Sequence, residues 1–140
     1  MKAILQLLRK AGGYRRELCL RVENPPYQQL VIEAIPEPGP LGLPCLSVAH
    51  YGEQNGDLMR DPEMCFELSN PLRLGISLAP YYWRNDYVGI EQWSRHFVNG
   101  NYFELLDLHE QHERFAATWD LNLRMQGFAT IFDPHNHTRG

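Results

Sequence analysis

The residues with the clearest potential for chemistry lie beside a short Asn-Gly pair. Asn55-Gly56 predicts a tight β-hairpin, because both central residues of a type I′ turn need a positive φ. Pairing outward from this turn places His50 opposite Asp61, with Glu63 on the same strand face. A histidine beside carboxylates could transfer protons as a general acid–base pair or bind a hard metal ion. His50, Asp61 and Glu63 are therefore the catalytic candidates.

Pro62 makes this arrangement conditional. Proline donates no ladder hydrogen bond, so it sits at a bulge or an edge. A bulge would move the following residues to the other face of the strand. We therefore expect a structural role for the three candidates before a catalytic one, and we assign no metal site and no cofactor. A metal-dependent hydrolase or nuclease that uses them with Asp57 is an alternative.

The hairpin and an aromatic segment after it form the predicted binding surface. Aromatic and arginine side chains supply much of the binding energy of protein interfaces, so Tyr82-Trp83-Arg84 is the best candidate for a contact point. We expect the partner to be a protein. The residues predicted to bind it are Tyr51, Glu53, Asp57, Arg60, Tyr82, Trp83 and Arg84.

Charge is distributed unevenly along the chain. The 140 residues include 13 Lys and Arg and 17 Asp and Glu, for a net charge of −4. Residues 1–21 hold six basic groups and one acid, or +5, so the remainder holds seven basic and 16 acidic groups, or −9. A partner with a phosphate backbone would favour a wholly basic protein. The alternative of a single-stranded nucleic-acid-binding module therefore rests on Arg15, Arg16 and Arg21 with the aromatic segment, and it is not favoured.

The composition indicates one globular domain. Hydrophobic residues make up 44% and charged residues 21% of the chain, as in ordinary globular proteins. No apolar run approaches the roughly 20 residues that span a bilayer, and no signal-peptide cleavage site is evident. Three scattered cysteines predict neither a disulfide framework nor a zinc site. We expect a cytoplasmic protein without membrane contact, with a single domain over residues 1–132 and a polar tail over 133–140.

The spacing of apolar residues predicts an α+β fold. A short helix is expected at residues 1–11, and strands are expected at 14–23, 30–35, 46–51, 58–68 and 72–78. Residues 36–44, with four prolines and two glycines, predict an exposed loop. Asn101, with Glu104 three residues later, predicts the start of a helix of about 25 residues that ends at Gly127. This long helix should cover one face of a largely antiparallel sheet of about five strands.

Three segments of the chain carry a family resemblance. They are residues 47–63 (SVAHYGEQNGDLMRDPE), 82–89 (YWRNDYVG) and 119–128. With them, residues 14–128 resemble an uncharacterised bacterial domain-of-unknown-function family that has a HYxEQNGDLxxDPE hairpin motif and is often encoded on mobile elements. The family pattern has an aromatic residue where this chain has Gly52. The resemblance implies one compact bacterial domain in a mobile-element setting, and it assigns no activity and no catalytic residue.

Together these observations favour a non-enzymatic accessory or interaction protein of a bacterial mobile genetic element. Its expected partner is a protein, and an inhibitor of a host defence system is one concrete form of this function. The oligomeric state is left open, because the sequence does not show which edge of the sheet is free.

Overall fold

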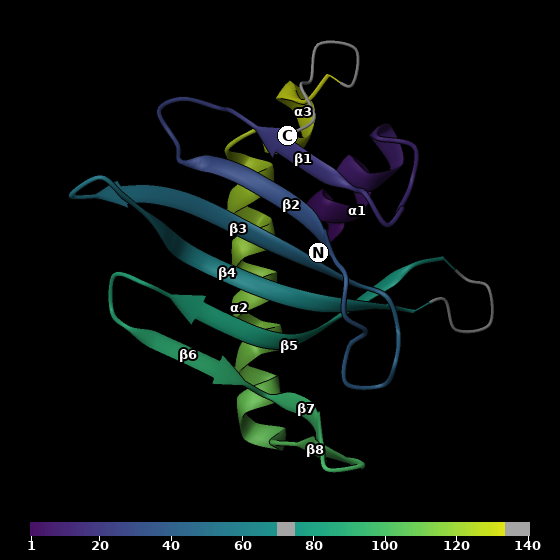
Figure 1. Ribbon diagram of the computed structural model, residues 1–140. Helices are drawn as coiled ribbons and strands as arrows, with labels where there is room; N and C mark the ends of the chain where they lie inside the picture. The colour runs from purple at the N-terminus through teal and green to yellow at the C-terminus, as the bar shows by residue number, and fades with distance from the viewer. Residues whose placement is uncertain (70–74, 134–140) are drawn as a thin grey trace.

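The computed structural model describes residues 1–69 and 75–133. Six antiparallel strands follow one another in chain order, and two further strands form a separate hairpin sheet (Figure 1). The strands of the large sheet are β1 (Cys19–Val22), β2 (Gln29–Ile35), β3 (Cys45–Gln54), β4 (Asp57–Ser69), β5 (Ser77–Asn85) and β6 (Ile90–Trp93). The hairpin sheet consists of β7 (Arg95–Val98) and β8 (Asn101–Glu104), and the helices are α1 (Lys2–Lys10), α2 (Leu106–Met125) and α3 (Phe128–Ile131).

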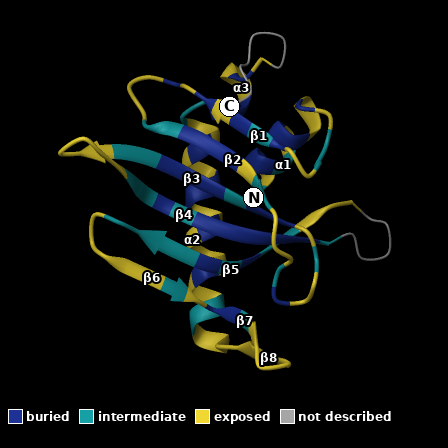
Figure 2. Ribbon diagram, in the orientation of Figure 1, coloured by how far each residue is buried: buried dark blue, intermediate teal, exposed yellow. Residues whose placement is uncertain are grey.

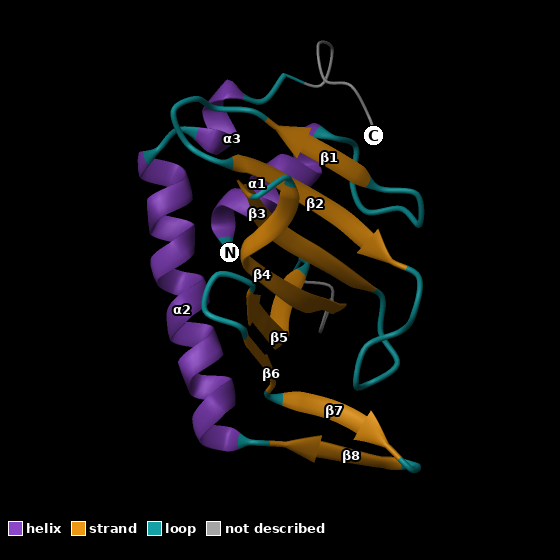
Figure 3. Cartoon of the chain, turned by 60° about the vertical axis from the view of Figure 1, so that its left-hand side comes forward, coloured by secondary structure: helices purple, strands orange, loops and turns teal. Residues whose placement is uncertain are grey.

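The helices lie on one face of the six-stranded sheet (Figure 3). Side chains alternate between the two faces of a strand, and alternate apolar residues in the inner parts of β1 to β4 belong to the core beneath the helices. The resulting core joins strand residues such as Ile32 and Phe66 to Leu7 of α1, Leu123 of α2 and Phe128 of α3. The backbone N–H of Ala3 also donates to the Asp120 carboxylate at 2.7 Å, which links α1 to α2. The predicted α+β architecture is thus confirmed, and no described helix is long and apolar enough to cross a membrane.

The prediction of five strands is wrong by one for the large sheet. The aromatic segment at residues 81–97 forms the end of β5, then β6 and β7. The predicted strand at 14–23 is shorter than expected and comprises β1 alone. Part of the predicted strand at 72–78, and all of the predicted polar tail except Asp133, lie outside the described residues.

The helix prediction is wrong at its N-terminus. Helix α2 has 20 residues rather than about 25, because Asn101–Glu104 pairs with β7 as strand β8. The turn between these strands is Asn99-Gly100, with φ values of 52° and 80°. It has the same residue types and the same positive φ angles as Asn55-Gly56, where φ is 53° and 85°. Leu105 precedes the first helical residue, and it makes no side-chain capping hydrogen bond.

Candidate functional site

The strand register separates the predicted catalytic residues. As expected, Tyr51 lies opposite Arg60, but Glu63 lies opposite Ala49 rather than Val48. The register shifts by one residue where Pro62 interrupts the ladder, since proline has no N–H to pair. His50 therefore faces the helices while Glu63 faces the open side of the sheet, and the predicted grouping of His50, Asp61 and Glu63 on one face is wrong.

His50 lies in the core beneath α2 and α3. Its ring centroid is 5.5 Å from that of Trp119 and 5.4 Å from that of Phe128. The Nδ1 atom lies 3.1 Å from the carbonyl oxygen of Gln28 and 3.3 Å from that of Gln29. A carbonyl oxygen only accepts, so Nδ1 carries the proton and donates it. Burial lowers the pKa of His50, which keeps the imidazole neutral at neutral pH.

The two carboxylates of the predicted cluster have separate partners. Asp61 accepts from the amide of Gln28 at 3.2 Å and from the amide of Asn85 at 2.8 Å. Glu63 accepts from the Ser47 hydroxyl at 2.5 Å. Among residues 1–69 and 75–133, no three His, Cys, Asp or Glu side chains are grouped closely enough to hold a metal ion. The visible role of both carboxylates is to cross-link neighbouring strands and turns.

A chain of charged side chains runs along the open face of the sheet. Arg60 contacts Asp86 at 3.3 Å, and Arg84 contacts the same carboxylate at 2.7 Å. Arg84 also contacts Glu91 at 3.0 Å, and the Tyr82 hydroxyl donates to Glu91 at 2.5 Å. Each group has a partner within the sheet, so the predicted binding residues Arg60, Tyr82 and Arg84 are engaged with one another.

The remaining predicted binding residues are dispersed. Trp83 faces α2, where its ring centroid is 5.7 Å from that of Phe115, so Tyr82-Trp83-Arg84 is split between the two faces of the sheet. Glu53 and Asp57 are exposed near the hairpin turn, and Tyr51 is half-buried on β3.

The predicted basic patch occupies two elements. Arg15 and Arg16 follow α1, whereas Arg21 lies on β1. The Nη1 atom of Arg15 donates to the carbonyl oxygen of Ala11 at 3.3 Å. Arg16 is exposed at the mouth of a hollow formed with residues 36–44.

A buried ion pair between β4 and β7 was not predicted. Glu67 and Arg95 have side chains only 1% and 4% exposed, and the Arg95 Nη1 atom donates to Glu67 Oε1 at 2.6 Å. The other oxygen of Glu67 accepts from the backbone N–H of Leu41 at 2.8 Å and of Leu43 at 3.3 Å. One carboxylate therefore anchors both the hairpin sheet and the proline-rich loop, most of whose residues are exposed, as predicted. The signal in the sequence is a glutamate inside the apolar strand run of β4.

His112 ties the corner between β6 and β7 to the long helix. Its Nδ1 atom lies 2.9 Å from the Ser94 hydroxyl, and its Nε2 atom lies 3.1 Å from the side-chain oxygen of Gln92. Burial, helped by the nearby His109, lowers the pKa of His112 to about 4. The histidine is therefore neutral at neutral pH and acts as a structural link.

On both sides of this corner in the chain, large apolar side chains are exposed. Of the 18 large hydrophobic residues that are exposed in the described chain, ten lie within residues 87–106. Leu106 is 71% exposed and Phe97 is 59% exposed. Figure 2 shows β8 and the start of α2 as largely exposed at one end of the molecule, and β7 is exposed at Phe97 and Val98. We call the following six residues the apolar tip: Phe97, Val98, Tyr102, Phe103, Leu105 and Leu106.

Comparison with known families places the chain. Residues 2–129 match the model of a family described as a domain of unknown function, DUF6908. The chain belongs to the DUF6908 family. Comparison with curated proteins gave no match, and comparison with solved structures gave none. The DUF6908 match includes both hairpins, α2 and every candidate residue named above.

Gly52 has a local explanation in this DUF6908 chain. A Cβ atom at position 52 would lie 2.3 Å from the Tyr87 hydroxyl and 2.6 Å from the side-chain nitrogen of Gln28. The Tyr87 hydroxyl donates to the carbonyl oxygen of Glu53 at 3.4 Å. Tyr87 and Gln28 thus occupy the space that a larger residue at position 52 would need.

Proposed function

We propose that this protein is a non-enzymatic interaction module that binds a partner protein through the apolar tip. The concentration of exposed aromatic and aliphatic side chains at this end carries the proposal. A soluble protein rarely exposes a large apolar patch unless the patch binds something. The predicted binding residues Arg60, Tyr82 and Arg84 are engaged in ion pairs and hydrogen bonds with Asp86 and Glu91, whereas the side chains of the tip are exposed.

The backbone under the tip supports a preformed binding surface. An isolated two-stranded hairpin is at best marginally stable in water. Here β7 is anchored by the Arg95–Glu67 pair, and the N–H of Leu105 donates to the carbonyl oxygen of Ser94 at 2.8 Å. Anchoring the hairpin before binding reduces the ordering entropy that association would otherwise lose.

The charges around the tip favour a basic partner. Residues 87–114 contain five exposed acids and two arginines, of which Arg95 is buried against Glu67 and Arg114 lies beside Glu110. The acids are interleaved with the apolar residues, and they are Glu91, Glu104, Asp107, Glu110 and Glu113. Complementary charges around an apolar contact raise the association rate and exclude wrong partners. The partner is therefore a protein segment with apolar side chains flanked by Lys or Arg.

The biological setting is part of the same proposal. The resemblance of the hairpin motif favours a cytoplasmic accessory protein of a bacterial mobile genetic element. Inhibition of a host defence factor is a function that a small protein can perform by binding alone. In that case the partner would be a host protein with a basic and apolar contact surface.

A matched pair of variants tests the contact surface. Phe103→Ser with Leu106→Ser removes two exposed side chains of the tip, and Met125→Ser removes a side chain that is 77% exposed at the far end of the same helix. Bacterial lysate is passed over the wild-type protein and both variants. We expect one protein to be retained by the wild type and by Met125→Ser but lost with the tip variant. Titration of that purified protein should give the same ranking and a weaker affinity at high salt.

Two outcomes contradict the proposal. One is that no retained protein distinguishes the tip variant from Met125→Ser. The other is a purified partner whose affinity is the same for the wild type and the tip variant.

A further inference from the structure

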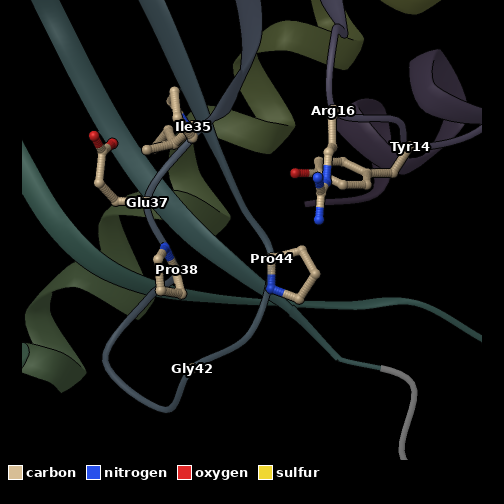
Figure 4. A pocket seen from close by; sticks show the side chains of 8 residues that line it. Tyr14, Arg16, Ile35, Glu37, Pro38, Gly42 and Pro44 are labelled. Atoms are coloured by element: carbon tan, nitrogen blue, oxygen red, sulfur yellow. The ribbon is translucent and has the colours of Figure 1, made fainter.

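A hollow of about 500 Å³ opens beside the proline-rich loop. Its lining residues all precede the apolar tip in the sequence. Tyr14 and Arg16 form one wall, and Ile35, Pro38 and Pro44 form much of the other (Figure 4). Its volume falls within the range of about 300–1,000 Å³ that is typical of small-molecule sites. The hollow lies between the basic segment after α1 and the proline-rich loop of residues 36–44.

The walls of the hollow are held in place. The carboxylate of Glu67 accepts two backbone hydrogen bonds from the loop, and a Cβ atom at Gly39 would lie 2.2 Å from the Glu67 side chain, so the loop packs closely on the sheet. On the opposite wall, the Tyr14 hydroxyl donates to the carbonyl oxygen of Cys45 at 3.3 Å. Proline rings also fix φ along the loop. The hollow is therefore formed before any ligand enters.

One charged group faces this space. The guanidinium of Arg16 lies beside the Tyr14 ring, whereas the carboxylate of Glu37 points away from it (Figure 4). Burial raises the pKa of Tyr14 and the charge of Arg16 opposes that rise, which agrees with the closeness of the two groups. Arg16 forms no hydrogen bond or ion pair with any residue in the described part of the chain.

Apart from Arg16, Glu37 and the Tyr14 hydroxyl, the side chains that line the hollow are apolar. Ile35 and the prolines offer hydrocarbon surface, and the Tyr14 ring offers an aromatic face. A guanidinium binds a carboxylate or a phosphate through two parallel hydrogen bonds. Apolar surface buried against the prolines adds affinity without any further polar group.

We propose that this hollow binds a small organic anion, with its carboxylate or phosphate group on Arg16 and its apolar body against Ile35, Pro38 and Pro44. The site contains none of the residues of the apolar tip. Carboxylates and phosphates share the chemistry that Arg16 recognises, and separate probes distinguish them.

The test is a titration of the ¹⁵N-labelled full chain, followed by amide NMR shifts. Benzoate and phenyl phosphate are the anionic probes, and benzylamine carries the same ring with a positive charge. We expect a saturable shift of the Tyr14 and Gly42 amides with at least one anion. The anion with the lower dissociation constant identifies the preferred headgroup.

Two variants assign the effect to the guanidinium. Arg16→Gln should raise the dissociation constant by about tenfold or more, because a charge-assisted hydrogen-bond pair is lost. Arg9→Gln removes another exposed charge, on α1 and outside the hollow, and should leave binding unchanged. The dispersion of the amide spectrum verifies that both variants fold. The proposal is overturned if neither anion saturates, if benzylamine shifts the same amides equally, or if the two variants bind alike.

Discussion

The two ends of α2 use the same kinds of side chain in opposite ways. Near its C-terminus, Trp119 and Leu123 are buried against the sheet and α3. At its N-terminus, Leu105 and Leu106 are exposed, together with the hairpin that leads into the helix. Both ends contain apolar residues at helical spacing, and only the first has a layer of the molecule to cover them.

This difference shows that periodic apolar residues identify the apolar face of a helix but do not show whether another part of the molecule covers that face. The sheet narrows to the short strand β6 at the end where α2 begins (Figure 1). Apolar residues beyond this edge have no strand beneath them, and the hairpin β7–β8 exposes side chains on both of its faces. We interpret one end of α2 as the core of the fold and the other as an interface.

The largest loss of stability is expected when the buried ion pair between Glu67 and Arg95 is broken. Glu67→Ala leaves Arg95 buried without its carboxylate and removes the acceptor for two N–H groups of the loop. Breaking a buried pair in this way costs about 3–5 kcal/mol. Urea unfolding measures the loss. Glu110→Ala, in an exposed pair with Arg114 at 3.9 Å, is the control and should change stability by less than about 0.5 kcal/mol. Equal losses would contradict the distinction.

The next prediction compares how much stability is lost when two leucines of α2 are replaced. Leu123→Ala creates a cavity in the core and should lower the free energy of unfolding by about 2–5 kcal/mol. Leu106→Ala removes a side chain that is 71% exposed, and a surface substitution of this kind changes stability by about 0.5 kcal/mol or less. The same substitutions should rank in reverse order for partner binding. A large stability loss in Leu106→Ala would show that the tip belongs to the core.

Acid should lower the free energy of unfolding, because His112 and His50 are buried in their neutral forms. The pKa of His112 is lowered to about 4 by burial and the nearby His109, and burial also lowers the pKa of His50. The unfolded chain then binds protons below about pH 6.5 while the folded chain resists them, so stability is full above that pH and falls toward pH 4. For His112 the loss approaches roughly 3 kcal/mol.

Unfolding in urea at pH 7 and pH 4.5 measures this slope. His112→Gln should flatten the slope, because the variant has no titrating ring at this position. His96→Gln, at a position on the hairpin itself, is the control. A slope that is equal in both variants would exclude His112 as its source.

The smallest change in stability is expected from substitutions in the two Asn-Gly turns. Gly56→Ala and Gly100→Ala each place a Cβ atom at a positive φ, with open space around it, which costs about 1 kcal/mol. Strands β3 and β4 continue into the core, so Gly56→Ala should lower global stability by that amount. Gly100→Ala should act on β7–β8 alone and raise hydrogen exchange there. Global destabilisation by Gly100→Ala would place the hairpin in the cooperative core.

Much of the fold was predictable because its signals are local. Alternating apolar residues and the Asn55-Gly56 turn predict β3 and β4. The predicted end of the long helix at Gly127, where φ is 82°, is also confirmed. Strand β8 is not predicted, because Asn101 and Glu104 also match a helix-capping pattern, although Asn99-Gly100 is the same turn signal as Asn55-Gly56. The shift at Pro62 depends on whether the strand bulges there, which the local sequence allows but does not require.

The candidate surfaces were less predictable, because they depend on which elements meet. Glu67 and Arg95 are 28 residues apart, and only the packing of the hairpin sheet beside the large sheet brings them together. Likewise, Leu105 fits the apolar stripe of α2 as well as Leu123 does, and its exposure follows from the width of the sheet rather than from any neighbour in sequence.

The buried pair gives the protein a single shared support. Glu67 holds the loop that walls the anion-binding hollow, and Arg95 begins the strand that carries the apolar tip. A change in the position of either side chain is therefore transmitted to two surfaces with different ligands. If occupancy of one surface shifts the pair, binding at the two surfaces is linked and each ligand alters the affinity of the other by the same factor.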